Sequence, residues 1–295
     1  MSLATLYIFF RSVYYCSMTI KSRNRLLKAL FFFSIVCCIL LAASLTVALL
    51  TDAIVPPSDS AVQTSLQRAL RGLPFMRCQF AATMTAIGIM ALYVPVTLFL
   101  IIAFFENTQS SEIIFFAGVL LGILCEGIRM LIPLFGLGLS FSHFLIFIGR
   151  VLAAGRFAVP LCFFCMATFS ETHQRQDVER NLTVVLALSV VLAAEIPLNT
   201  AQLTTTCAIP TGFAKASVLV RFLIFALALL SFLLNARKHG ILEMKKMALY
   251  YAVLVAGYVL LLLADSFVLL GLGTAALALG TVQFLRNLHR LYKWK

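Results

Sequence analysis

Long runs of apolar residues, separated by short polar breaks, extend along almost the whole chain. The runs are about 17 to 25 residues long, enough for a helix to cross a hydrocarbon layer of about 30 Å. Backbone in lipid must satisfy its own hydrogen bonds, so such runs predict helices. We expect an all-α fold, a polytopic transmembrane helical bundle that forms a single integral membrane domain over 1–295 with no separate soluble domain. The predicted spans lie near 28–51, 80–105, 113–137, 141–168, 182–198, 217–234, 247–264 and 267–285.

The last two predicted spans share one apolar stretch, 247–285, which is too long for one ordinary span and barely long enough for two. The distribution of basic residues favours two. With the amino terminus inside and eight spans, fifteen Lys and Arg residues fall in cytoplasmic segments and four fall outside. Seven spans would place eleven inside and eight outside, which fits the positive-inside rule less well. We therefore expect eight spans, with Asp265 and Ser266 at an external turn, and keep seven as the alternative.

The basic segment from Lys21 to Lys28 precedes the first apolar run, as in a signal peptide. The run exceeds the apolar core of about 7 to 15 residues that signal peptides carry, so we expect an uncleaved signal anchor. The sequence leaves open both cleavage of this span and the choice between Met1 and Met18 as the start.

Composition narrows the class of protein. Hydrophobic residues make up 62% of the chain, charged residues 12%, and the net charge is +12. The basic residues gather beside the ends of apolar runs, so we expect a lipid bilayer as partner and no nucleic acid. The chain has no glycine-rich phosphate-binding motif and its histidines are scattered, so we expect no cofactor and no metal. This composition and the placement of the basic residues fit a protein of a bacterial cytoplasmic (inner) membrane.

Seven ionisable residues lie within the apolar runs and are candidates for a ligand-binding site or a buried charge network. A charge at the bilayer centre costs about 3 kcal/mol even on insertion scales, so such residues normally face a protein interior or a wet cavity. Three are acidic and four are arginines, so they can nearly neutralise one another. They are Glu126, Arg129, Arg150, Arg156, Glu195, Arg221 and Asp265.

Helical spacing brings some of these residues together. Gly118, Gly122 and Glu126 recur every four residues and share one face of the third span, and Arg129 follows Glu126 by three. Small residues let a neighbouring helix approach closely. The fourth span is an antiparallel neighbour because only a short turn separates the two. We therefore expect Glu126 to pair with Arg156 near the middle of the fourth span, or with Arg129.

Under the eight-span topology, Glu195, Arg221 and Asp265 lie near the external ends of their spans. The polar residues then extend from the middle of the bilayer outward, which predicts a vestibule open to the extracytoplasmic side. The set contains more arginines than acidic residues, and guanidinium groups match carboxylate or phosphate, so an anionic ligand is favoured. In the alternative interpretation, the pair formed by Glu126 and Arg129 only stabilises helix packing. Glu195, Arg221 and Asp265 then extend their polar ends to the membrane–water interface.

Cys78 follows the first external loop and Cys207 lies in the external connection 199–216. Both lie on the oxidising side of a bacterial inner membrane, so a disulfide between them is possible. Two separate thiols are the simpler expectation.

The segment Glu126-Gly127-Ile128-Arg129 is similar to the acid-plus-arginine arrangement of intramembrane CAAX-type proteases. It lacks their adjacent glutamate pair and a suitably placed histidine. We therefore expect no catalytic residues and no enzyme, with an intramembrane enzyme as the alternative.

The compact bundle with short loops and a basic carboxyl-terminal tail resembles the membrane-sensing modules that precede output domains in bacterial signalling proteins. The resemblance implies a ligand-sensing or partner-binding module that contacts a cytoplasmic signalling protein or another membrane subunit. The first alternative is a secondary transporter or permease subunit for a small, anionic solute. Pro133 and Pro160 interrupt the first half as in such folds, although the two halves show no self-similarity. The second alternative is a structural or assembly protein. The ligand and the oligomeric state stay open.

Overall fold

The computed structural model describes residues 20–56, 63, 67, 78–105, 110–137, 143–169, 178–200, 202–239 and 242–293. This part of the chain consists of helices and their connections, with one isolated bridge, between Leu198 and Thr211, as its only extended pairing. The all-α prediction is confirmed for these residues. The alternative starts at Met1 and Met18 lie outside them.

Each predicted span corresponds to one long helical segment in the described residues. The third of these segments is broken into three pieces. The helices are α2 (Ile20–Leu50), α4 (Phe80–Phe105), α5 (Glu112–Cys125), the 3-10 helix η1 (Glu126–Met130), α6 (Leu131–Leu134), α7 (His143–Phe169), α8 (Val178–Glu195), α9 (Ala214–His239), α10 (Leu242–Leu262) and α11 (Phe267–Lys293). The apolar stretch 247–285 is divided between α10 and α11, and Asp265 and Ser266 lie in the turn between them.

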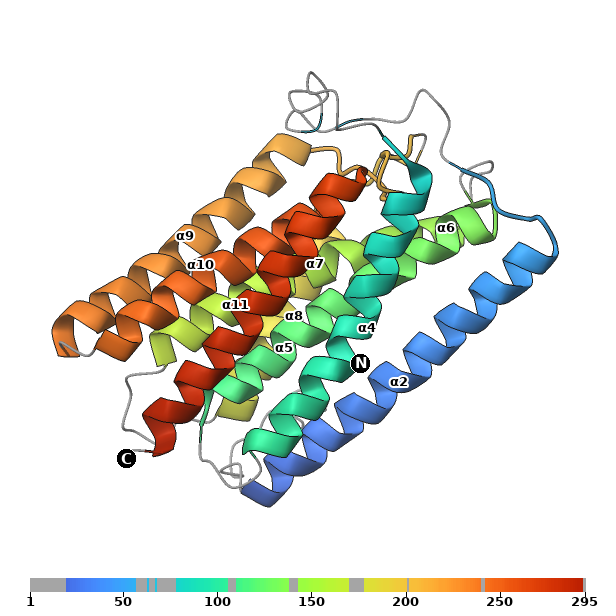
Figure 1. Ribbon diagram of the computed structural model, residues 1–295. Coiled ribbons are helices and arrows are strands. Elements are labelled where there is room, and N and C mark those ends of the chain that lie inside the picture. The colour runs from blue at the N-terminus through green and yellow to red at the C-terminus, as the bar shows by residue number, and fades with distance from the viewer. Residues whose placement is uncertain are drawn as a thin grey trace, which may run out of the picture.

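Successive segments run in opposite directions and place their connections at two ends of the bundle (Figure 1). We call the end with the α8–α9 connection (196–213) the loop end, and the end where α2 begins and α11 finishes the terminal end. At the loop end, the backbone N–H of Gln79 donates to the carbonyl of Asp265 at 2.7 Å. At the terminal end, Arg23 donates to the carbonyl of Phe105 at 2.8 Å. These contacts tie α2, α4 and the α10–α11 hairpin into one bundle.

Seven of the described helical segments are long and apolar enough to cross a membrane. The eighth, α8, has 18 residues and carries Glu179, Arg180 and Glu195, all near its ends. The outer surface presents large apolar side chains; Phe32, Phe99 and others like them are at least 60% exposed. Side chains of this kind suit contact with lipid, and the helices indicate an integral membrane protein.

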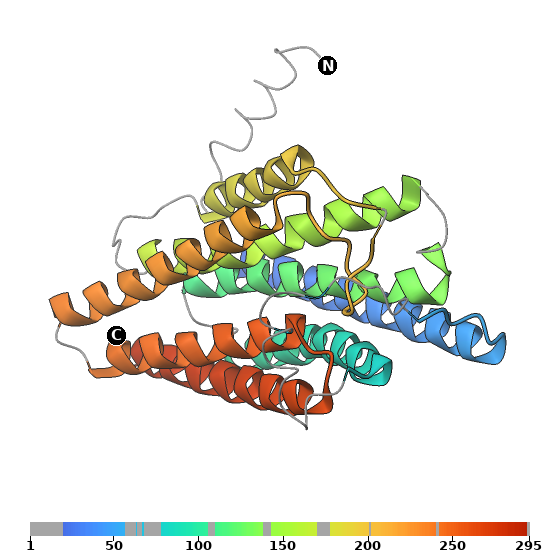
Figure 2. The same ribbon diagram turned by 90° about the horizontal axis from the view of Figure 1, so that it is seen from above.

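Helix α5 lies centrally, with α7, α8 and α9 on one side and α4, α10 and α11 on the other (Figure 2). Its contact with α7 depends on two glycines. A Cβ atom at Gly122 would lie 2.8 Å from the carbonyl oxygen of Gly155, and one at Gly155 would lie 2.7 Å from that of Gly122. The two backbones therefore touch, as small residues allow in membrane bundles. This contact brings Glu126, one turn after Gly122, within reach of Arg156, which directly follows Gly155.

The interior has two halves of different composition. The half nearer the terminal end is filled by aromatic rings from five helices, with centroid separations from 5.1 Å between Phe163 and Tyr251 to 6.3 Å. We call this set the aromatic cluster; it comprises Phe116, Phe163, Phe225, Phe232, Tyr251 and Phe284. The half nearer the loop end contains Glu126, Arg129, Arg156 and Arg221, whereas the buried Arg23 and Glu112 lie at the terminal end itself. Helices α7, α9 and α10 contribute to both halves.

Candidate functional site

The third span changes from α-helix to 3-10 helix at Glu126, so the helix break and the buried acid coincide. Pro133 contributes to the irregularity, because it has no N–H to donate to the carbonyl of Arg129 four residues earlier. A 3-10 segment within a long helix often marks a hinge or a strained functional position. Here it sets the relative orientation of the Glu126 and Arg129 side chains.

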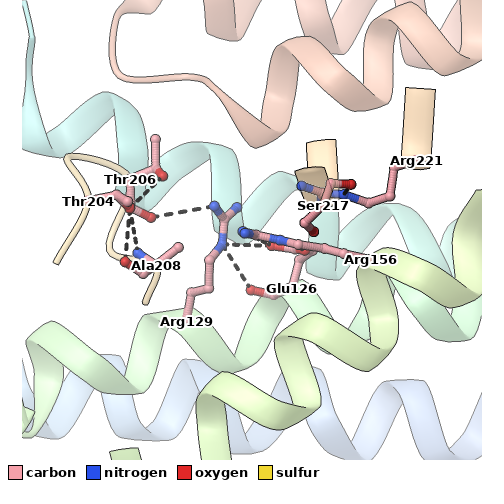
Figure 3. Close-up of polar contacts among 8 residues, drawn as sticks. All are labelled: Glu126, Arg129, Arg156, Thr204, Thr206, Ala208, Ser217 and Arg221. Atoms are coloured by element: carbon pink, nitrogen blue, oxygen red, sulfur yellow. Dashed lines mark hydrogen bonds and ion pairs between the residues drawn. The ribbon is translucent and has the colours of Figure 1, made fainter. Parts of the chain in front are cut away.

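Glu126 is fully buried and binds two arginines (Figure 3). Arg156, from α7, donates through Nε to Oε1 at 2.7 Å and through Nη2 to Oε2 at 3.1 Å. Arg129 places its Nε 3.0 Å from Oε2 of the same carboxylate. The fork of Arg156 is the geometry that guanidinium groups prefer with carboxylates. A single carboxylate therefore binds two cations, the buried Arg129 and the partly exposed Arg156.

Arg129 also contacts the α8–α9 connection, which enters the interior of the bundle. Its Nη1 donates to the carbonyl of Thr206 at 3.4 Å. Thr206, Cys207 and Ala208 are all buried, and Cys207 has a φ of 55°. Thr204 holds the turn, since its hydroxyl accepts from the N–H of Ala208 at 2.9 Å. Non-helical backbone at this depth is tolerated where protein surrounds it or where it lines a cavity.

Arg221 brings a third guanidinium to the same region from α9 (Figure 3). It lies on the inward stripe of that helix, with the buried Ser217 one turn before it and the buried Ala228 two turns after it. Its Nε donates to the carbonyl of Ser217 at 3.1 Å. Arg221 interacts electrostatically with Arg156 and Glu126, yet no carboxylate in the described part of the chain lies within ion-pair distance of it. We call Glu126, Arg129, Arg156 and Arg221 the charged cluster.

Tyr258, on α10, borders the charged cluster. Its side chain is 2% exposed, and its hydroxyl has no hydrogen-bond partner among the described residues. All four members of the charged cluster interact with it electrostatically. Tyr258 could not be identified from the sequence, because a tyrosine in an apolar run is common and gives no sign of what its hydroxyl faces.

The structure brings four of the seven predicted site residues together and places the other three elsewhere. Arg150 donates to the carbonyls of Ala193 and, at 2.6 Å, Ile196, so it caps the end of α8. Glu195 is exposed at the end of α8. Asp265 is buried in the α10–α11 turn, where its backbone carbonyl accepts from Gln79.

The remaining predicted features concern cysteines and metals. Cys78 is exposed and Cys207 is buried, and both carry reduced thiols in the structure. Burial raises the pKa of the Cys207 thiol to about 11, against a smaller opposing effect of Arg129 and with a further increase from Cys78. The two thiols therefore lie within electrostatic reach of each other. In the described residues, no three His, Cys, Asp or Glu side chains are grouped so as to hold a metal ion.

Comparison with known proteins adds no further assignment: no protein-family model, no curated protein and no solved structure matches the chain. The site must therefore be interpreted from its own geometry. That geometry is a group of three guanidiniums around one fully buried carboxylate, bordered by a phenolic hydroxyl that has no partner among the described residues.

Proposed function

We propose that this protein is a ligand-sensing membrane module that binds a small anion at the charged cluster. The observation that carries the proposal is the charge balance, three arginines to one glutamate, in a region where the glutamate is fully buried. An uncompensated cation is costly in a low-dielectric interior. An anionic ligand removes that cost, and guanidinium groups select carboxylate or phosphate.

The distribution of charge at the two ends supports entry of the ligand from the loop end. Described basic residues gather at the terminal end, among them Lys21, Arg237, Lys245 and Arg286. By the positive-inside rule, that end faces the cytoplasm of a bacterial inner membrane and the loop end faces outward. The aromatic cluster fills the interior on the cytoplasmic side of the charged cluster. The site is then reached from outside, and the basic terminal end offers a docking surface to a cytoplasmic signalling protein or another membrane subunit.

The helix break supports transmission of a signal. Glu126 begins η1 and Arg129 lies within it, so any ligand that competes for these side chains acts on the irregular part of the third span. A change in η1 geometry alters the relation between α5 and α6. Helix α5 reaches the terminal end, where Glu112 accepts a hydrogen bond of 2.5 Å from Tyr292 of α11. A shift at the site thus has a direct mechanical route to the cytoplasmic surface.

A secondary transporter is the second candidate, and a specific observation favours it. The broken third span and the buried non-helical segment around Thr206 resemble the interrupted helices that line transporter sites. In this case the aromatic cluster acts as the closed inner gate. Uptake of a radiolabelled anion into proteoliposomes separates the two candidates, because a sensor binds the anion without accumulating it inside.

Binding itself is tested with purified protein in nanodiscs. We expect inorganic phosphate or succinate to raise the melting temperature at constant ionic strength, with chloride as the balancing salt. Arg156→Leu removes the cation that shares Glu126 with Arg129, so we expect this variant to insert normally and to lose the shift. Wild-type binding in Arg156→Leu would contradict the proposal.

A further inference from the structure

Two buried tyrosines on α10 differ in one respect that points to a ligand. Tyr251 is 1% exposed and its hydroxyl donates to the carbonyl of Phe225 at 3.1 Å. Tyr258 follows seven residues later, on the same face of the helix, and is 2% exposed, but its hydroxyl has no partner in the described residues. A buried hydroxyl without a partner is unfavourable, so each one in a native structure needs a reason. Tyr258 differs from Tyr251 in lying beside the charged cluster.

Arg221 has unused hydrogen-bonding capacity in the same region. A guanidinium carries five N–H donors. Among the described residues, only the Nε of Arg221 is bonded, to the carbonyl of Ser217. Its side chain extends toward Arg156 (Figure 3). Arg221 lies on the inward stripe of α9 and is partly exposed.

Glu126 cannot compensate for Arg221 as well. Its Oε1 already accepts from Arg156, and its Oε2 is shared by Arg156 and Arg129. Arg156 keeps an accessible edge, since its side chain is 20% exposed whereas that of Glu126 is 0% exposed. Nη1 of Arg156 and both Nη atoms of Arg221 therefore have no acceptor among the described residues.

We propose that Arg221, Tyr258 and the accessible edge of Arg156 form a subsite for the oxygen atoms of a phosphate or carboxylate group of the ligand. This inference rests on the proposed function and specifies which atoms contact the ligand. The planar fork of Arg221 matches two oxygens of such a group, and the Tyr258 hydroxyl donates to a third or shared oxygen. Glu126 stays bound to Arg129 and Arg156, so the ligand adds to the cluster and does not have to displace the protein's own carboxylate.

The test compares matched substitutions in the complete protein, reconstituted in phosphatidylcholine nanodiscs. Tyr258→Phe removes only the unpartnered hydroxyl, and Tyr251→Phe removes only the partnered one. Arg221→Gln removes the subsite cation, and Arg150→Gln removes an arginine that caps α8. Inorganic phosphate and succinate are the probes, and affinity comes from titrated melting shifts at constant ionic strength.

We expect Tyr258→Phe to weaken probe binding about tenfold and Arg221→Gln about a hundredfold, the range for lost hydrogen bonds to a charged group. Without probe, Tyr258→Phe should melt at or above the wild-type temperature, because it removes an unsatisfied group. Tyr251→Phe and Arg150→Gln should melt lower and keep wild-type affinity. A purely structural role for Tyr258 would reverse the behaviour of the two tyrosine variants.

The possible outcomes distinguish failure of the proposed function, anion binding at the charged cluster, from failure of the proposed subsite alone. Wild-type protein that binds neither probe overturns the proposed function and the subsite together. Wild-type protein that binds a probe, with affinity unchanged in both Tyr258→Phe and Arg221→Gln, overturns the subsite and leaves the proposed function standing. Nanodiscs that contain phosphatidic acid distinguish a lipid source of the phosphate group. If phosphatidic acid abolishes phosphate binding in wild-type protein, the subsite takes a lipid headgroup.

Discussion

The two halves of the interior share helices α7, α9 and α10 but differ in how polar side chains on these helices are satisfied. On α10, Tyr251 of the terminal half donates to a backbone carbonyl, whereas Tyr258 of the loop half has no described partner. On α9, Phe225 and Phe232 join the aromatic cluster, whereas Arg221 near the start of the same helix has no described counter-ion. The hydroxyl within the aromatic cluster is therefore satisfied by the protein itself, whereas the hydroxyl beside the charged cluster has no partner among the described residues. Near the terminal end, outside the aromatic cluster, Ser110, Asn287 and His289 also carry buried polar atoms without a described partner.

Under the proposed function, packing interactions and ligand binding are located at different levels of one bundle. Lipid tails are as apolar as the helix surfaces, so close packing and buried polar contacts, and not the exclusion of water, hold such helices together. The aromatic rings supply packing without any charged group. The charged cluster supplies interactions that are strong but unbalanced, which suits a site whose occupancy changes. Substitutions in the two halves should therefore have separable effects.

Replacing Glu126 with Gln should have the largest effect on stability. The variant leaves Arg129 and Arg156 without their shared carboxylate, and breaking a buried ion pair in this way costs about 3–5 kcal/mol. Unfolding by sodium dodecyl sulfate in mixed micelles measures the loss. The double variant Glu126→Gln/Arg156→Gln should recover part of it, because one stranded cation is removed. Equal stability of Glu126→Gln and wild type would show that the pair adds nothing.

Phe163→Ala should destabilise the terminal half by about 3 kcal/mol, since it opens a cavity among the aromatic rings. Phe163 contacts Phe116, Phe225 and Tyr251, and is fully buried. The same micelle assay measures the loss. Affinity for phosphate should stay at the wild-type value in protein that remains folded. A change of affinity comparable to that of Arg221→Gln would show that the two halves are not independent.

Gly155→Ala should cost about 1–3 kcal/mol, because the new methyl group would lie 2.7 Å from both the Gly122 carbonyl oxygen and the Cβ of Cys125. The separation of α5 and α7 should also weaken the contact between Glu126 and Arg156. Gly88→Ala is the matched control, since its methyl group meets no atom within 4 Å. A stable Gly155→Ala variant with normal binding would contradict the role given to this close approach.

The smallest expected effect is a difference between the rates at which a thiol reagent labels Cys78 and Cys207. Cys78 is exposed, whereas Cys207 is buried and burial raises its pKa to about 11. A raised pKa keeps the thiol protonated at neutral pH, so Cys207 should react slowly and accelerate as the pH rises toward 11. Labelling of Cys78→Ser and Cys207→Ser, followed by mass spectrometry, assigns each rate. A shift between reducing and non-reducing gels that disappears in Cys78→Ser would instead reveal a disulfide between the two.

Helix positions could be predicted from the sequence because each depends on local hydropathy. The stretch 247–285 illustrates this: charge distribution favoured two helices, and the chain turns between Leu262 and Phe267. The proximity of Glu126 and Arg156 was also accessible, since glycine spacing on α5 and a short connection to α7 limit the possible neighbours. These features need only sequence spacing and one pair of adjacent helices.

Other features depend on contacts between distant segments and could not be predicted. Arg150 was grouped with the other buried charges, but the end of α8 provides carbonyls that it caps. The segment around Thr206 was expected to be an external connection, yet it folds into the bundle and contacts Arg129. Its run of threonines followed by Cys207 and Ala208 is less polar than an ordinary loop, which is the one signal that the sequence offers.

The contact between Arg129 and Thr206 has a consequence for how the protein is made. The two residues are 77 positions apart in the chain, so the arginine leaves the ribosome well before the carbonyl that it meets. The chain forms α7 and α8 between these two residues, so both helices are made before the segment around Thr206 can pack against Arg129. The loop half can consequently be completed only after these helices have been synthesised.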